Sequence, residues 1–161
     1  MMAIQVGEKI PSVTLQQMQQ SGVVDITTEE LFDGKKVVVF GLPGAFTPTC
    51  SVSHLPGYVV KSDEIFAKGV DSIICISVND AFVMGAWGEQ NNVDDRVKMI
   101  ADGNANFARA VGLDLDLTGR GMGVRSQRYA MVVTNGIVET LNIEAAGKFE
   151  VSDADTILNS L

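Results

Sequence analysis

Two runs of apolar, largely β-branched residues constrain the fold of this chain more than any other feature. The first is VVVFGL, Val37–Leu42, and the second is SIICISV, Ser72–Val78. Such runs, without polar alternation, are typical of strands that are buried on both faces. A helical stretch from about Cys50 to Lys68 lies between them, although Pro56-Gly57 should kink or break it. This order predicts a β-α-β unit at the centre of a sheet.

Strands and helices alternate along the rest of the chain. Strands are predicted at residues 13–18, 23–26, 98–101, 129–134 and 137–143, with hairpin turns at Ser21-Gly22 and Asn135-Gly136. Helices are predicted at residues 28–32, about 80–90, 104–111 and about 153–161, with caps at Thr28, Asn79-Asp80 and Ser152. The Gly-rich stretch 118–124 is predicted to be a loop. The predicted fold class is therefore α/β, a central mixed sheet flanked by helices in one domain over residues 1–161.

The charge balance argues against several classes of partner. The net charge is −8, and no cluster of Lys and Arg exists that could neutralise phosphates. We therefore expect no binding to nucleic acid and no docking on an anionic membrane. No stretch approaches the ~18 apolar residues of a membrane span. The first residues, Met1 to Ser12, lack the basic and apolar parts of a secretory signal.

Cysteine and histidine usage narrows the chemistry further. Two cysteines and one histidine make neither a disulfide framework nor a zinc site. The usage predicts a reducing cytoplasm as the compartment. There, a retained cysteine is more often chemical than structural.

The most informative segment is PGAFTPTCS, residues 43–51, which leaves the C-terminal end of a buried strand and begins a helix. Ligand sites of open α/β sheets gather at such positions. Cys50 falls in the first helical turn, where unpaired N–H groups and the helix dipole stabilise an anion such as a thiolate. Thr47 can place its hydroxyl beside the sulfur, and Pro43 and Pro48 stiffen the loop without adding competing donors. The alternative is an inert cysteine buried as a small hydrophobic residue, which this combination makes the weaker interpretation.

The pattern Pro43-x-x-x-Thr47-x-x-Cys50 is the signature of peroxiredoxins. With the following block HLPG, residues 54–57, it resembles their type II (peroxiredoxin-five) subgroup. Further blocks at residues 7–11, 77–80 and 128–129 agree in order and spacing, so the resemblance covers nearly the whole chain. It implies a thioredoxin-like fold, a homodimer, and a thiol-dependent peroxidase that reduces hydrogen peroxide and alkyl hydroperoxides at Cys50. It also implies a part in cell redox homeostasis and in the response to oxidative stress.

Arg128 stands directly before the predicted strand YAMVV, in the one local concentration of basic residues. Arginines in such a loop are usually solvated. A guanidinium at the mouth of a buried strand could instead stabilise a thiolate and the alkoxide that leaves as an O–O bond breaks. The sequence alone does not bring Arg128 to Cys50. The resemblance does, and it implies that Arg128 holds both the thiolate and the peroxide.

The remaining candidates are interpreted mainly as structural. Cys75 lies in mid-strand between isoleucines, so we expect it to be buried and unable to reach Cys50. His54, one turn beyond Cys50, is expected to have a structural or secondary role. Core or dimer-interface positions are expected for Trp87 and Phe82. The resemblance implies that Leu117 and the loop 121–123 wall a pocket for an alkyl chain.

The predicted reaction has two halves. Cys50 attacks the peroxide and becomes a sulfenic acid, with Thr47 and Arg128 binding the substrate. Related proteins that resolve the sulfenic acid within one chain carry a further cysteine near the C-terminus, whereas here residues 147–153 read GKFEVSD. An external thiol must therefore restore Cys50, with glutathione or glutaredoxin favoured over thioredoxin. No metal, flavin or nicotinamide cofactor is required.

Two rival functions remain at this point. A thiol–disulfide oxidoreductase is disfavoured because Thr47 stands where a Cys-x-x-Cys motif needs its first cysteine. A thioredoxin-like interaction module or redox sensor would keep Cys50 without turnover, and only an assay of peroxidase activity separates it from the enzyme.

Overall fold

The two apolar runs lie side by side at the centre of the sheet. In the computed structural model, which describes residues 2–161, β3 (Lys36–Leu42) pairs in parallel with β4 (Ser72–Ser77), and Phe40 lies opposite Cys75. Both strands are almost wholly buried. The predicted central β-α-β unit is therefore confirmed.

Five further strands complete a seven-stranded mixed sheet in the order β2-β1-β5-β4-β3-β8-β9. Only the neighbours β3-β4 and β4-β5 are parallel. The remaining neighbours are antiparallel, and a bulge between Val132 and Val133 shifts the register of β8 against β9. The bounds are β1 (Thr14–Gln19), β2 (Gly22–Thr27), β5 (Lys98–Ala101), β8 (Tyr129–Thr134) and β9 (Ile137–Ile143).

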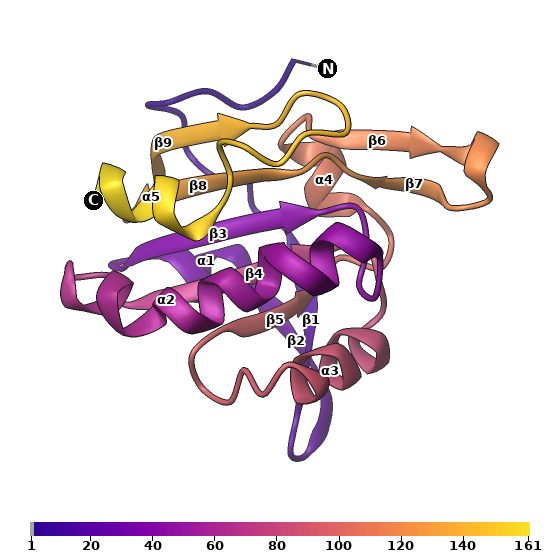
Figure 1. Ribbon diagram of the computed structural model, residues 1–161, viewed down its shortest axis with the longest axis horizontal. Helices are drawn as coiled ribbons and strands as arrows, with labels where there is room; N and C mark the ends of the chain where they lie inside the picture. The colour runs from indigo at the N-terminus through magenta and orange to yellow at the C-terminus, as the bar shows by residue number, and fades with distance from the viewer. Residues whose placement is uncertain (1) are drawn as a thin grey trace.

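Helices cover both faces of this sheet, as the sequence predicts. In Figure 1, the long α2, together with α3 and α5, lies in front of the sheet, while α1 and α4 lie behind it. In this view the N-terminus lies at the top, above β9, and the C-terminus lies beside α5. The bounds are α1 (Thr28–Phe32), α2 (Leu55–Ala67), α3 (Ala81–Gln90), α4 (Asn106–Ala110) and α5 (Ala154–Ser160).

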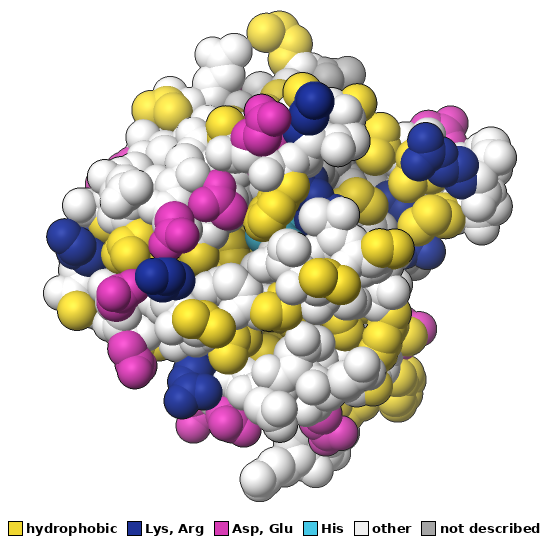
Figure 2. Space-filling model, viewed as in Figure 1, with side chains coloured by type: hydrophobic (Ala, Val, Ile, Leu, Met, Phe, Trp, Pro, Cys, Tyr) yellow, Lys and Arg dark blue, Asp and Glu magenta, His cyan; other side chains and the backbone are white. Residues whose placement is uncertain are grey.

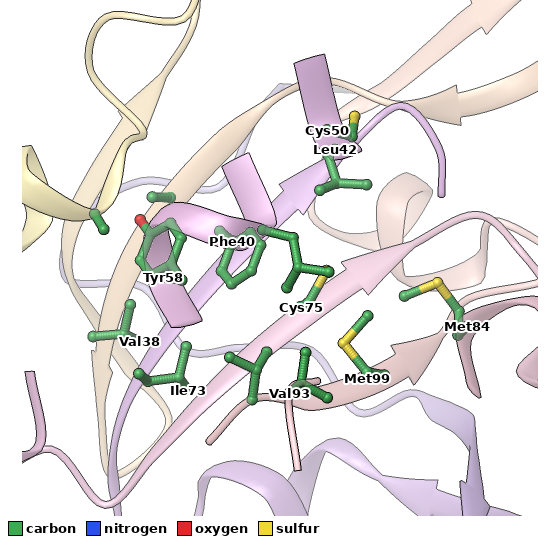
Figure 3. Packing of buried hydrophobic residues seen from close by; sticks show 14 of the residues in the cluster. Val38, Phe40, Leu42, Cys50, Tyr58, Ile73, Cys75, Met84, Val93 and Met99 are labelled. Carbon is green, nitrogen blue, oxygen red and sulfur yellow. The ribbon is translucent and has the colours of Figure 1, made fainter. Parts of the chain in front are cut away.

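The alternation of side chains along β3 divides the interior into two cores. Val38, Phe40 and Leu42 point to the side of α2, α3 and α5, whereas Val37 and Val39 point to the side of α1 and α4. Figure 3 shows part of the first core, in which Phe40, Tyr58 and Cys75 lie together in its middle. Burial on both faces explains why β3 needs an uninterrupted apolar sequence.

Two predicted helix caps are wrong by one residue. Thr27, not Thr28, caps α1, and it forms a reciprocal capping box with Glu30. Asp153, not Ser152, caps α5 through the N–H of Thr156. Each predicted residue has another partner, because Thr28 donates to Pro11 O and the hydroxyl of Ser152 donates to Glu144. The cap of α3 at Asp80 is confirmed.

The expected break at Pro56-Gly57 does not occur. The helix begins at Pro48, forms a π-helical turn over Cys50–His54 and continues as α2. Within the π turn the N–H of Leu55 reaches back five residues to Cys50 O. Pro56 follows directly after the π turn, at the second position of α2, so the residue without an N–H stands where the helix changes from π to α spacing.

The Gly-rich stretch near residue 120 is more ordered than the predicted loop. It forms the turn of a two-stranded antiparallel sheet made by β6 (Asp114–Leu117) and β7 (Gly123–Ser126). A short 3₁₀ turn over Thr118–Arg120 joins the two strands. In Figure 1 this hairpin extends from the main sheet at the end opposite α5.

Within residues 2–161, no helix combines the length and apolar character needed to cross a membrane. The space-filling view in Figure 2 shows Lys and Arg side chains separated from one another on the viewed face, with acidic and hydrophobic side chains between them.

Candidate active site

Cys50 lies directly after the loop that leaves the C-terminal end of β3, in the first turn of the helix that begins at Pro48. Its side chain has no exposed surface. The placement therefore agrees with the predicted helix start, and it also surrounds the thiol with protein. A π-helical turn begins at Cys50, and such turns occur frequently at functional sites.

Backbone and side-chain bonds hold the loop of residues 43–49 in one shape. Asn79 Oδ1, at the end of β4, accepts from the N–H of Ala45 at 2.9 Å. Arg125, which lies on the β6–β7 hairpin, donates from Nη1 to Pro43 O at 3.2 Å. A Cβ at Gly44 would lie 2.6 Å from Arg125 Nη1, so a larger residue there would push aside the guanidinium that bonds Pro43 O. The loop is thus held from two sides, by Asn79 just after β4 and by Arg125 on β7.

Thr47 bonds within the same loop. Its hydroxyl donates to Gly44 O at 2.7 Å, and its carbonyl accepts from the N–H of Ser51. The hydroxyl proton is therefore used locally. The role of Thr47 toward the sulfur or a bound peroxide stays a prediction.

Arg128, between β7 and β8, reaches the cysteine as the resemblance implies. Its Nη2 donates to Cys50 Sγ at 3.1 Å, although the two residues are 78 positions apart in the sequence. Its Nη1 contacts Nδ1 of His54 at 2.8 Å, and its guanidinium lies over the ring of Phe149 at 5.8 Å. The fork of one guanidinium thus spans sulfur and imidazole, which fixes its orientation.

The partners of His54 determine its tautomer. The guanidinium can only donate, so Nδ1 must accept, and Nε2–H then donates to Ser152 O at 3.1 Å. Burial, and next the charge of Arg128, lower the pKa of His54 to about 3. His54 is therefore neutral at physiological pH and orients Arg128. The expected secondary role is refined to this one.

The neutral histidine gives a testable pH dependence of stability. The pKa of His54 falls from 6.5 to about 3 on folding, so below pH 6.5 the unfolded chain binds a proton that the folded chain does not. The free energy of unfolding should then fall by up to about 1.4 kcal/mol per pH unit as the pH drops from 6.5 toward 5. Urea unfolding of the unmodified chain and of His54→Gln measures this slope. Equal slopes in the two proteins would contradict it.

Cys75 is fully buried in β4, between Phe40 of β3 and Met99 of β5, as expected. Burial, and next the proximity of Cys50, raise the pKa of its thiol well above the ordinary value. Figure 3 shows Cys50 at one end of the core and Cys75 deep between the strands. Little thiolate forms at such a site, so Cys75 is poorly suited to attack another sulfur.

The two aromatic candidates on α3 differ in burial. Trp87 is fully buried, and its Nε1 donates to Ser51 Oγ at 3.1 Å, next to Cys50. Phe82 is 70% exposed, so it is not a core residue. Leu117 lies at the end of β6, and its place beside an alkyl-binding pocket stays a prediction.

Several residues that shape the site were not predicted from the sequence. Asn79 was expected as part of a cap and of the shared block at residues 77–80, Arg125 only as one of the basic residues near Arg128, and Ser152 as a cap. Phe149 was noted only as part of a segment that lacks a cysteine. A signal existed for Asn79, since polar residues after a central strand often serve a site.

Comparison with known proteins agrees with this geometry. The Redoxin family matches residues 5–158. Peroxiredoxin-2C of Arabidopsis thaliana is 44% identical over 162 residues, which covers 100% of both chains. A solved structure of reduced Prx3 from Vibrio vulnificus in complex with H2O2 is 55% identical, with a TM-score of 0.94 over 98% of each chain. The 1-Cys peroxiredoxin of Plasmodium falciparum is 29% identical, with a TM-score of 0.87 over 96% of each chain.

These similarities cover nearly the whole chain and confirm the expected thioredoxin-like fold. They also decide among the three functions left open by the sequence, in favour of the peroxidase over an oxidoreductase of disulfides or a non-enzymatic module. The chain belongs to the Redoxin family as a type II peroxiredoxin, an enzyme that reduces peroxides with a thiol.

Proposed function

We propose that Cys50 is the nucleophile that attacks the peroxide, and that Arg128, Thr47 and Pro43 form the rest of the catalytic site. The observation that carries this proposal is the 3.1 Å contact between Arg128 Nη2 and Cys50 Sγ in the first turn of a helix. A permanent positive charge and the helix start both stabilise a thiolate there. Pro43 shapes the loop, and its carbonyl is tied to Arg125.

In the first half-reaction, the thiolate of Cys50 attacks the distal oxygen of a hydroperoxide, ROOH. The S–O bond forms as the O–O bond breaks, which gives a sulfenic acid and an alkoxide that takes up a proton to leave as ROH. Arg128 is well placed to stabilise the charge that develops on the leaving oxygen, because its donors are fixed before the reaction. We propose hydrogen peroxide and alkyl hydroperoxides as substrates.

In the second half-reaction, an external thiol reduces the sulfenic acid. We propose glutathione, alone or with glutaredoxin, and thioredoxin as the less favoured reductant. The thiol displaces water to form a mixed disulfide, and a second thiol then releases the Cys50 thiolate. Two observations support an external thiol: Cys75 is fully buried, and no cysteine follows it in the chain. The similar Plasmodium falciparum protein is itself described as a 1-Cys peroxiredoxin.

A single cysteine is expected to suffice for turnover. Cys75→Ser should keep the glutathione-coupled reduction of hydrogen peroxide within about twofold of the unmodified rate, because a buried thiol of raised pKa takes no part. Steady-state assays with glutathione and glutaredoxin measure this rate. If Cys75→Ser abolishes turnover while circular dichroism shows an intact fold, the scheme with an external resolving thiol is wrong.

We further propose a cytoplasmic homodimer. Phe82 is 70% exposed at the start of α3, and Phe46 is 48% exposed on the adjacent loop, where its ring lies 6.3 Å from that of Trp87. Exposed aromatic residues of this kind are enriched at protein interfaces. Sedimentation equilibrium of the purified chain tests the dimer, and a monomer mass at micromolar concentration would contradict it. Fractionation of cells tests the compartment.

A further inference from the structure

The segment between β9 and α5 contains a buried carboxylate that no role assigned so far uses. Glu144 is 8% exposed and lies just after β9. Both ion pairs found among residues 2–161 involve Lys61, so Glu144 has no cationic partner in the described chain. A buried charge without a counter-ion costs free energy unless hydrogen bonds satisfy it.

Backbone N–H groups satisfy this carboxylate. It accepts from the N–H groups of Glu150, Val151 and Ser152 at 2.8–2.9 Å, and from the hydroxyl of Ser152 at 2.7 Å. Burial raises the pKa of Glu144, but these hydrogen bonds outweigh it and hold the pKa below the ordinary value. The carboxylate is therefore ionised at neutral pH, and it folds residues 150–152 around itself as an anion-binding loop.

The loop so ordered presents one backbone carbonyl to the active site. Ser152 O accepts from the hydroxyl of Tyr58 at 2.7 Å and from Nε2 of His54 at 3.1 Å. Tyr58 is itself fixed by stacking on Phe40, with ring centroids 4.1 Å apart. The carbonyl therefore has a defined position, which in turn defines the plane and tautomer of His54.

The fixed ring of His54 in turn orients the guanidinium of Arg128. Its free Nδ1 accepts from Arg128 Nη1 at 2.8 Å, and Arg128 Nη2 then points at Cys50 Sγ. A direct backbone hydrogen bond also joins the two residues, because the N–H of Glu144 donates to Arg128 O at 2.9 Å. Glu144 is thus connected to Arg128 both through the sheet and through the loop.

We propose that Glu144 is a positioning residue of the peroxidase: its carboxylate fixes the carbonyl of Ser152, which holds His54 as the acceptor that aims Arg128 at Cys50. The proposal rests on the proposed function of Cys50 and Arg128. It gives residues 144–152 a role, although they supply no resolving thiol. Small errors in the position of a catalytic group cost about tenfold to a hundredfold in rate, so the effect of losing this support is measurable.

The test compares Glu144→Gln with Glu150→Gln, an exposed residue of the same loop whose substitution removes the same charge. The measured quantity is the rate at which hydrogen peroxide oxidises the reduced protein, followed by the fluorescence of Trp87 next to Ser51. We expect about a tenfold loss for Glu144→Gln and a change below about twofold for Glu150→Gln. A loss below twofold for folded Glu144→Gln, or an equal loss for Glu150→Gln, would overturn the proposal.

A double-mutant cycle separates positioning from a general loss of stability. If Glu144 acts through His54, then Glu144→Gln combined with His54→Gln should lose no more rate than the more damaging single change. Additive losses would overturn the proposed route. Should Glu144→Gln fail to fold, Ser152→Ala removes one bond to the carboxylate and should lower the rate in the same direction; an unchanged rate would contradict the proposal.

Arg128→Gln, measured in the same series, distinguishes the two levels of the argument. If it keeps the full rate, then the proposed function of Arg128 is wrong, and the positioning role is wrong with it. If it loses the rate while Glu144→Gln does not, then only the positioning role is wrong.

Discussion

Replacement of Cys50 by serine should reduce peroxidase activity to the background rate, a loss of at least about a thousandfold. A serine hydroxyl at this position occupies nearly the same space, but hydroxyls are far less acidic than thiols, and the species that attacks peroxide oxygen is a thiolate. Serine differs from cysteine by one atom, and Arg128 Nη2 can donate to its hydroxyl oxygen, so the substitution should leave the fold intact. Glutathione-coupled assays with hydrogen peroxide measure the loss.

The matched control for this experiment is Cys75→Ser, which makes the same sulfur-to-oxygen change at the other cysteine. Cys75 lies in the middle of β4 and should tolerate the change with its activity kept. If turnover survives in Cys50→Ser, or disappears in Cys75→Ser instead, then Cys50 is not the cysteine that reacts with the peroxide.

Arg128→Gln should have the second-largest effect, a fall of about a hundredfold to a thousandfold in the rate with peroxide. The substitution removes the guanidinium that donates to Cys50 Sγ and leaves the Nδ1 atom of His54 without its donor. Both the thiolate and the transition state then lose their positive partner. Stopped-flow oxidation of the reduced protein, over a range of peroxide concentrations, measures this rate constant.

Two further variants make the arginine test specific. Arg128→Lys restores the charge, but an ammonium lacks the planar fork that spans the sulfur and the imidazole, so it should recover only part of the rate. Arg120→Gln removes a nearby exposed arginine and should leave the rate unchanged. Full recovery with lysine would mean that charge alone matters, and an equal loss with Arg120→Gln would contradict a specific role for Arg128.

The elements whose sequence pattern is local were predicted well. The apolar runs at β3 and β4 identified the centre of the sheet, and Asn135-Gly136 identified the hairpin between β8 and β9. The β6–β7 hairpin was missed because its strands have four residues each and lie outside the main sheet. Thr28 was mistaken for the cap of α1 because adjacent threonines offer the same hydroxyl, and only backbone geometry selects Thr27.

The site residues also fall into those that local sequence predicts and those that it does not. Cys50 could be predicted because its loop and helix are continuous in sequence, whereas Arg128 needed the family pattern to bridge 78 positions. Glu144 and Arg125 escaped prediction for a physical reason. Their partners are backbone groups, the N–H groups of residues 150–152 and the carbonyl of Pro43, and a backbone group leaves no trace in the sequence.

The central claim is that Cys50 reacts with the peroxide and then depends on a thiol from outside the chain. Intact-protein mass spectrometry after one equivalent of hydrogen peroxide and excess glutathione tests it most directly. We expect one glutathione per chain, mapped to Cys50, present in Cys75→Ser and absent in Cys50→Ser. An adduct on Cys75, or a disulfide between Cys50 and Cys75 in place of the adduct, would contradict the account.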